Sequence, residues 1–88
     1  MPEQNIDEKL IDYCHTVATM VQIRLGEKYA VHAGKINKNH NIRVGIGIEK
    51  TNTDLPNTVF IHSDGVYADN MPPVKAAAYA IMSYRHPL

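Results

Sequence analysis

The stretch Ile42-Arg43-Val44-Gly45-Ile46-Gly47-Ile48 decides the fold class of this chain. Its four β-branched residues alternate with arginine or glycine, and a period of two is typical of a strand with one apolar face. The other face carries two glycines, so it is nearly free of side chains and another backbone can approach it closely. We therefore expect a sheet protein in which helices cover the apolar face of this strand.

Helices are predicted at both ends of the 88-residue chain. Residues 6–25 repeat apolar side chains every three or four positions, follow a candidate N-cap at Asn5 and precede Gly26, a residue type that ends helices. A second helix begins near Pro73, because proline suits the first helical position, and it stops before Pro87. The positions that we expect to be buried are Ile6, Leu10, Tyr13, Cys14, Val17, Met20 and Val21 in the first helix and Val74, Ala77, Ala78, Ile81 and Met82 in the second.

Three strands are predicted between these helices, over residues 29–36, 42–49 and 58–62. The asparagine-rich residues 37–41 predict a hairpin turn, residues 50–57 a loop, and residues 66–71 are compatible with a short helical turn. Short connections favour antiparallel neighbours. Residues 1–88 are therefore predicted to form a single α+β domain in the order α-β-β-β-α, with a three-stranded antiparallel sheet packed on two helices.

The charge balance argues against a protein that is held on nucleic acid by long-range attraction. Nine lysines and arginines face nine aspartates and glutamates, so the formal net charge is zero. Charge-driven binding to nucleic acid normally needs a clear basic excess. The charge is uneven, however, because residues 24–50 contain six lysines and arginines and two glutamates. Local contact of this middle segment with phosphates therefore stays open.

Cysteine usage and hydropathy predict a cytoplasmic protein. Cys14 is the only cysteine, so no internal disulfide can form, which fits a reducing compartment. No apolar run approaches the roughly 18 residues that cross a membrane, and the first residues lack the basic and apolar segments of a signal peptide. We expect no membrane partner, and Met1 indicates that the chain begins at its natural start.

No motif specifies catalytic or metal chemistry. The five histidines show no His-x-x-His spacing, whereas zinc needs three or four converging ligands. Cys14 and His15 are neighbours on a helix and point about 100° apart, so they cannot form a nucleophile–base pair. His62 and Ser63 are neighbours along a strand and point to opposite faces. We therefore predict that the protein is not an enzyme and has no catalytic residues, metal ligands or cofactor.

The strongest candidates for binding a partner lie on the predicted hairpin and on the glycine-bearing face of the sheet. The hairpin over residues 35–43 is basic and rich in asparagine, a composition that can contact phosphates. Gly45 and Gly47 either make room for the ring of Phe60 or His62 on a neighbouring strand, or leave a bare strip for a partner. The candidate partner-binding residues are Lys35, Lys38, His40, Arg43, Gly45, Gly47, Phe60 and His62.

Two segments resemble a known family. They are residues 35–48, Lys-Ile-Asn-Lys-Asn-His-Asn-Ile-Arg-Val-Gly-Ile-Gly-Ile, and residues 56–61, Pro-Asn-Thr-Val-Phe-Ile. With a leading and a trailing helix, they resemble the N-terminal region of an uncharacterised family, a domain of unknown function, from Gram-positive gut bacteria. Asn57 departs from that pattern, because the family places threonine directly after the proline. The resemblance implies no activity, substrate or catalytic residue.

These observations favour a small non-enzymatic protein-binding module that works by surface complementarity. In size and element order alone the chain also resembles some phage-encoded inhibitors of bacterial CRISPR nucleases, so we expect an inhibitor or adaptor encoded by a phage or mobile element. The alternative is a nucleic-acid-binding accessory protein that uses the hairpin over residues 35–43. The strand over residues 29–36 is a candidate edge that a partner or a second copy extends, so a homodimer is a further expectation.

Overall fold

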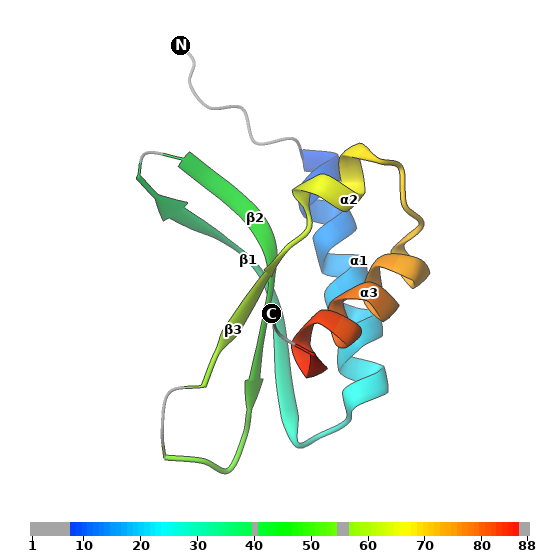
Figure 1. Ribbon diagram of the computed structural model, residues 1–88. Helices are drawn as coiled ribbons and strands as arrows, with labels where there is room; N and C mark the ends of the chain where they lie inside the picture. The colour runs from blue at the N-terminus through cyan, green and yellow to red at the C-terminus, as the bar shows by residue number, and fades with distance from the viewer. Residues whose placement is uncertain (1–7, 40, 55–56, 87–88) are drawn as a thin grey trace.

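The computed structural model describes residues 8–39, 41–54 and 57–86, and its elements follow the predicted order with one short helix added, near the helical turn expected over residues 66–71 (Figure 1). These elements are α1 (Glu8–Leu25), β1 (Tyr29–Lys38), β2 (Asn41–Lys50), β3 (Val59–His62), α2 (Asp64–Ala68) and α3 (Pro73–Arg85). The strands form an antiparallel sheet in the order β1-β2-β3, and the helices lie against one of its faces (Figure 1). The fold is therefore α+β, with a three-stranded antiparallel sheet packed on helices, as the sequence predicts.

β1 and β2 form a longer hairpin than the sequence predicts. Their register runs from Tyr29 opposite Lys50 to Lys38 opposite Asn41, so the connection is Asn39 and His40 rather than the whole of residues 37–41. Asn39 has a φ of 53°, a left-handed conformation that asparagine adopts more readily than most residues. The hairpin end of the two strands bends away from the helices (Figure 1).

The apolar face of β2 lies at the centre of the core. Ile46 and Ile48 are fully buried, and they pack in one cluster with Val17 and Val21 of α1. The buried face of α1 is the predicted one, because its apolar residues recur at helical spacing and its other positions are mostly polar. Cys14 is also buried, Tyr13 and Met20 pack at the margin of the core, and Asn5 and Ile6 lie outside the described residues.

α3 buries a different face from the one that the sequence predicts. Its buried residues are Ala76, Ala77, Ala80 and Ile81. Ala78 is exposed, and Val74 and Met82 remain 51% and 57% exposed, so their predicted burial is wrong. The true face is displaced by one residue, which is about 100° of helix rotation. Because α3 is apolar on several sides, its periodicity does not fix its orientation, and the small alanines let it lie close to α1.

Two tyrosine contacts link the helices to each other and to the sheet. The rings of Tyr13 and Tyr67 meet edge to face with centroids 5.2 Å apart, and those of Tyr29 and Tyr84 do so at 5.9 Å. The Tyr13 hydroxyl donates a hydrogen bond to the carbonyl oxygen of Met71 at 2.6 Å. Burial of this hydroxyl raises the pKa of Tyr13. The contacts of Tyr13 hold α1 against the segment that leads into α3, and the contact of Tyr29 with Tyr84 joins β1 to α3.

Candidate functional site

The sheet face that is turned away from the helices carries five of the eight predicted partner-binding residues. Gly45 lies opposite His62 and Gly47 opposite Phe60, and directly opposed residues of an antiparallel pair share a face. Arg43 belongs to the same face because side chains of a strand alternate. The rings of Phe60 and His62 lie edge to face with centroids 5.3 Å apart. The structure therefore brings these five residues together.

Of the remaining three predicted residues, the structure places the side chain of Lys35 alone. Lys35 lies opposite Val44, which is buried on the helix-covered side, so Lys35 belongs to the helix side at the rim of the sheet. His40 and the side chain of Lys38 lie outside the described part of the chain. The predicted set thus divides between the two faces of the sheet.

Gly45 is required by the pairing of β2 with β3 and is not part of a bare strip. A Cβ atom here would overlap the carbonyl oxygen of Ile61 and lie 2.8 Å from the Cα of His62, so only glycine admits β3 at this distance. Gly45 is accordingly buried. Gly47 is less constrained, because its Cβ would meet Thr58 at an ordinary 3.4 Å. The backbone of β3 fills the space over Gly45, where the sequence suggested an aromatic ring or a partner.

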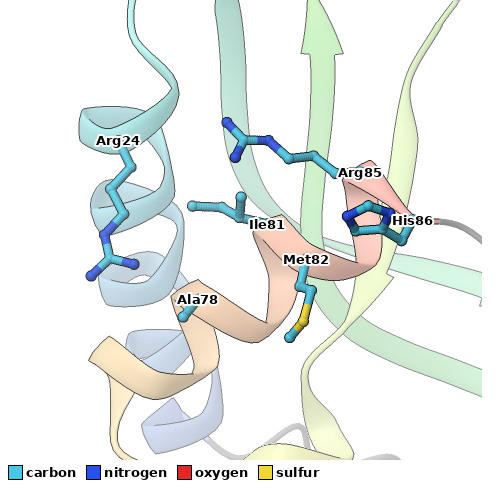
Figure 2. Close-up of a pocket in the computed structure, with 6 residues that line it drawn as sticks. All are labelled: Arg24, Ala78, Ile81, Met82, Arg85 and His86. Atoms are coloured by element: carbon cyan, nitrogen blue, oxygen red, sulfur yellow. The ribbon is translucent and has the colours of Figure 1, made fainter.

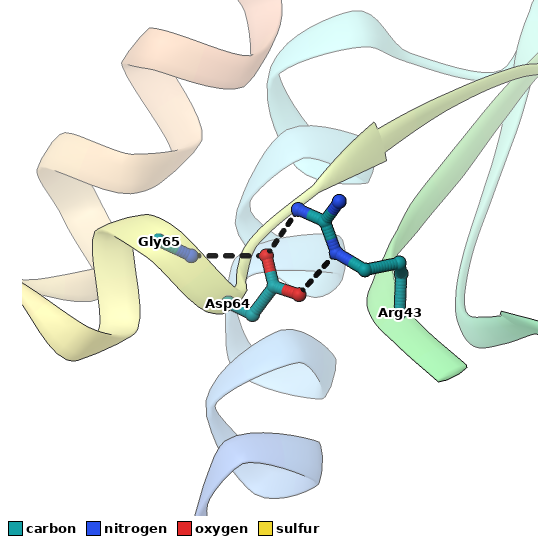
Figure 3. A network of polar contacts seen from close by, with 3 residues as sticks. All are labelled: Arg43, Asp64 and Gly65. Carbon is teal, nitrogen blue, oxygen red and sulfur yellow. Dashed lines mark hydrogen bonds and ion pairs between the residues drawn. The ribbon is translucent and has the colours of Figure 1, made fainter. Parts of the chain in front are cut away.

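Arg43 is held by an ion pair within the protein (Figure 3). Its Nε donates to Oδ2 of Asp64 at 2.6 Å and its second guanidinium nitrogen donates to Oδ1 at 2.9 Å. The Gly65 N–H also donates to Oδ1 of Asp64 at 3.0 Å. The hydrogen bond from Arg43 is the main reason that the pKa of Asp64 lies below its usual value. Arg43 thus joins the sheet to α2, and its charge is matched by Asp64, which weakens the hairpin as a site for phosphates.

A hollow of about 450 Å³ lies where the hairpin meets β3. Its walls come from the end of the hairpin and from the outer face of β3: Ile36, Asn39, Asn41, Ile42, Arg43, Phe60 and His62. Most of these groups are neutral, and the one arginine already faces Asp64. The hollow therefore offers an aromatic and aliphatic wall but little free positive charge.

The free edge of the sheet at β1 has a defined set of backbone groups. The Thr51 N–H donates to the Lys28 carbonyl at 2.9 Å, in the same register as the β1–β2 pair. Hydrogen-bonded residues alternate along an antiparallel ladder, so the even-numbered residues of β1 bond to β2. The odd-numbered residues from Tyr29 to Asn37 consequently direct their N–H and C=O groups to the open edge.

Gln22 of α1 closes the first half of this edge. Its side-chain oxygen accepts a hydrogen bond from the Val31 N–H at 2.9 Å, and its side-chain nitrogen donates to the Tyr29 carbonyl at 2.7 Å and to the Gly26 carbonyl at 3.0 Å. A side-chain amide has the same donor and acceptor as a peptide group. Gln22 therefore occupies the place of a neighbouring strand over residues 29–31.

The second half of the edge stays open. Among the described residues, none forms a hydrogen bond with the outward backbone groups of Ala33, Lys35 or Asn37. Two hollows, of about 130 and 340 Å³, flank this half between α1 and β1, and both include His15 and Ala33. The smaller is lined by Ile11, Cys14, His15, Ala33, Gly34, Lys35 and Val44, and its surface is mainly apolar. Open backbone groups thus lie next to pockets for side chains.

Sequence reasoning identified the β1 strand as an edge but missed Gln22, Ile11 and His15. Gln22 is a polar residue directly after the buried Val21, so it lies at the margin of the buried face of α1. This position is the one sequence signal for its hydrogen bonds to the edge of β1. The contact itself depends on how α1 lies across the sheet, which a helical repeat does not specify. The missed residues therefore belong to the packing of two elements rather than to a motif.

The histidine and cysteine side chains that the structure describes lie apart from one another at the positions that the sequence singled out. His32 and His62 share the outer face but lie on β1 and β3, with β2 between them. Within the described residues, no three histidine, cysteine, aspartate or glutamate side chains come close enough to hold a metal ion. Cys14 is buried, and burial is the main cause of its raised pKa. The thiol therefore stays protonated near neutral pH, and it packs as a small apolar group.

Comparison of the chain with known protein families, with curated proteins and with solved structures finds no significant match. The resemblance to the family from gut bacteria therefore stays a prediction. In the described ranges, none of the helices combines the length and the apolar character needed to pass through a bilayer.

Proposed function

We propose that the protein is a non-enzymatic protein-binding module that receives an extended segment of its partner as a fourth strand beside β1. The observation that carries this proposal is the open edge over residues 33–37, where outward backbone groups lie beside two pockets. When a peptide adds to a sheet edge, main-chain hydrogen bonds supply affinity and pockets for alternate side chains supply specificity.

The pockets indicate the kind of segment that fits. Alternate residues of an added strand lie on one face and are about 6.6 Å apart, so two of them can enter neighbouring pockets. The smaller pocket has apolar walls from Ile11, Cys14 and Val44, which suit an aliphatic side chain. The larger pocket includes the polar residues Thr19, Gln22 and His32. We expect an extended peptide with an aliphatic residue at one position and a polar residue two positions away.

Such a module changes its partner by occupying a surface, which is how inhibitors and adaptors act. We therefore retain an inhibitor or adaptor, encoded by a phage or mobile element, as the specific form of the proposal. The alternative, a nucleic-acid-binding protein that uses the hairpin over residues 35–43, is weaker because Asp64 matches the charge of Arg43. A homodimer is an alternative use of the same edge.

The experiment selects binders from a displayed library of short random peptides and compares two variants at one edge position. Lys35→Pro removes an outward N–H without removing a bond of the β1–β2 ladder, and edge strands tolerate proline for this reason. Lys35→Gln changes the side chain but keeps the N–H. We expect selected peptides to have the alternating pattern, to bind the wild type and Lys35→Gln alike, and to lose binding to Lys35→Pro. Circular dichroism is used to check that both variants fold.

Three outcomes would contradict the proposal. The first is a selection that enriches no peptide, and the second is a set of peptides that binds Lys35→Pro as well as the wild type. The third is binding of a short fluorescent DNA or RNA oligonucleotide that weakens with salt and is lost in the variants Lys38→Ala and Arg43→Ala, because a loss of this kind identifies phosphate contacts. That third result would establish the nucleic-acid alternative in place of the peptide site.

A further inference from the structure

The exposed face of α3 carries an apolar stripe that the fold leaves uncovered. Val74, Ala78 and Met82 recur every four residues and are all exposed, with Tyr79 beside them at 49% exposure. Residues four apart lie on one side of a helix. This stripe is separate from the edge of β1, because α1 packs over β1 and β2 whereas α3 lies against α1 and β3.

Positive charge borders the stripe. Figure 2 shows Arg24 from α1 and Arg85 from α3 on either side of Ile81, with Met82 and His86 nearby. These residues and Ala78 line a hollow of about 410 Å³. Neither arginine forms an ion pair with another described residue. Each stands in the last turn of its helix, where it also offsets the helix dipole.

The charges of α3 are all of one sign. Lys75 and Arg85 are its charged residues, at opposite ends of the stripe, and the helix contains no aspartate or glutamate. A second copy of the chain that placed its α3 against this face would bring like charges together, which is unfavourable. The acidic residues Glu8 and Asp12 belong to α1, whose apolar face is already buried in the core. The surface is therefore not complementary to itself.

We propose that the stripe of Val74, Ala78 and Met82, with the arginines beside it, is a second docking surface, which binds an acidic amphipathic helix of a partner protein. The apolar face of such a helix covers the stripe, in the manner of helices that dock into grooves. Its carboxylates meet Arg24 and Arg85 at one end and Lys75 at the other. With two separate surfaces, the protein acts as an adaptor between an extended segment at β1 and a helix at α3.

The test uses two synthetic amphipathic helical peptides that share one apolar face. One peptide has glutamates along the borders of this face, and the other has lysines there. We expect the glutamate peptide to bind at least roughly tenfold more tightly in a fluorescence anisotropy titration, and its affinity to fall with added salt. Arg85→Glu should reverse or abolish this preference, and Met82→Glu should weaken binding of the glutamate peptide. Both side chains are exposed, so these variants are expected to fold.

The matched control is Lys35→Glu, which makes the same charge change on the other side of α1 and should leave the binding of both peptides unchanged. Lys35→Pro should also leave it unchanged, so this proposal and the one for β1 can fail separately. Equal binding of the two peptides, binding of neither, or no effect of Met82→Glu would overturn the inference. Sedimentation that reveals a dimer abolished by Met82→Glu would overturn it too, because a second copy would then be the occupant.

Discussion

α1 and α3 both cover the sheet, but their sequences define their buried faces to different degrees. In α1, apolar residues such as Val17 and Val21 alternate with polar ones at helical spacing, so one face alone is suited to the core. In α3, alanines and larger apolar residues occur on several sides, and the helix settles one residue away from the predicted orientation. A contrast between apolar and polar positions, rather than apolar content, determines which face of a helix is buried.

The strongest test of this comparison is a pair of leucine substitutions at adjacent alanines of α3. Ala77 is fully buried and Ala78 is exposed. Ala77→Leu forces extra atoms between α3 and α1, so we expect a loss of about 3 kcal/mol in the free energy of unfolding. Ala78→Leu should change it by less than about 0.5 kcal/mol. Urea denaturation measures both, and the reverse ranking would restore the orientation that the sequence predicts.

A cavity in the well-defined helix should have the next largest effect. Val21 of α1 is fully buried in the cluster with Ile46 and Ile48. Val21→Ala removes two methyl groups from this cluster, and we expect a loss of about 2 kcal/mol in the free energy of unfolding. Ile23, which is 76% exposed on the same helix, supplies the control. If Ile23→Ala is as destabilising as Val21→Ala, the assigned face of α1 is wrong.

The hydrogen bond from Tyr13 tests how α1 holds the segment before α3. Tyr13→Phe keeps the ring against Tyr67 but removes the donor to the Met71 carbonyl. We expect a loss of about 1 kcal/mol in stability, because the carbonyl loses its partner in a half-buried place. Thermal unfolding of the variant and the wild type measures this loss. An unchanged midpoint would mean that water replaces the hydroxyl without penalty.

The smallest effect concerns α2 and depends on pH. The pKa of Asp64 is lowered in the folded protein, chiefly by the hydrogen bond from Arg43. The ion pair therefore stabilises the fold fully at pH values above 3.8, the ordinary pKa of this carboxyl group. This stabilisation is lost as the pH falls through the lowered pKa of the folded state. Asp64→Asn removes this contribution. We expect the wild type to be slightly more stable than Asp64→Asn at neutral pH and the difference to vanish in acid. Urea denaturation at several pH values provides the measurement, and a constant difference would contradict the assignment.

Much of the fold follows from local sequence patterns. The alternation of Ile42, Val44, Ile46 and Ile48 predicts the central strand and its buried face, and the glycine and proline signals predict both long helices. The rotation of α3 does not follow, because it depends on which small side chains meet α1. The ion pair of Arg43 with Asp64 does not follow either, because it joins residues 21 positions apart through the path of β3.

The candidate site is predicted less well than the fold. Gly45, Gly47, Phe60 and His62 lie together on the outer face of the sheet, as the alternation of side chains along β2 and β3 implies. Glycine is nevertheless required at position 45 because the backbone of β3 passes very close to it. The distance between two strands cannot be predicted from the apolar pattern of one of them. The open edge at β1 is bounded by Gln22 and flanked by pockets beside α1, which appear only when helix and sheet are brought together.

The amide of Gln22 limits the length of sheet edge that is open to another strand. An unprotected ten-residue edge strand is a template on which further strands, and then fibrils, can grow. By bonding the Tyr29 carbonyl and the Val31 N–H, this glutamine shortens the open template to the stretch from the Val31 carbonyl to Asn37. Any strand added there would pair over about half the length of β1, so a single side chain limits how far the sheet can extend at this edge.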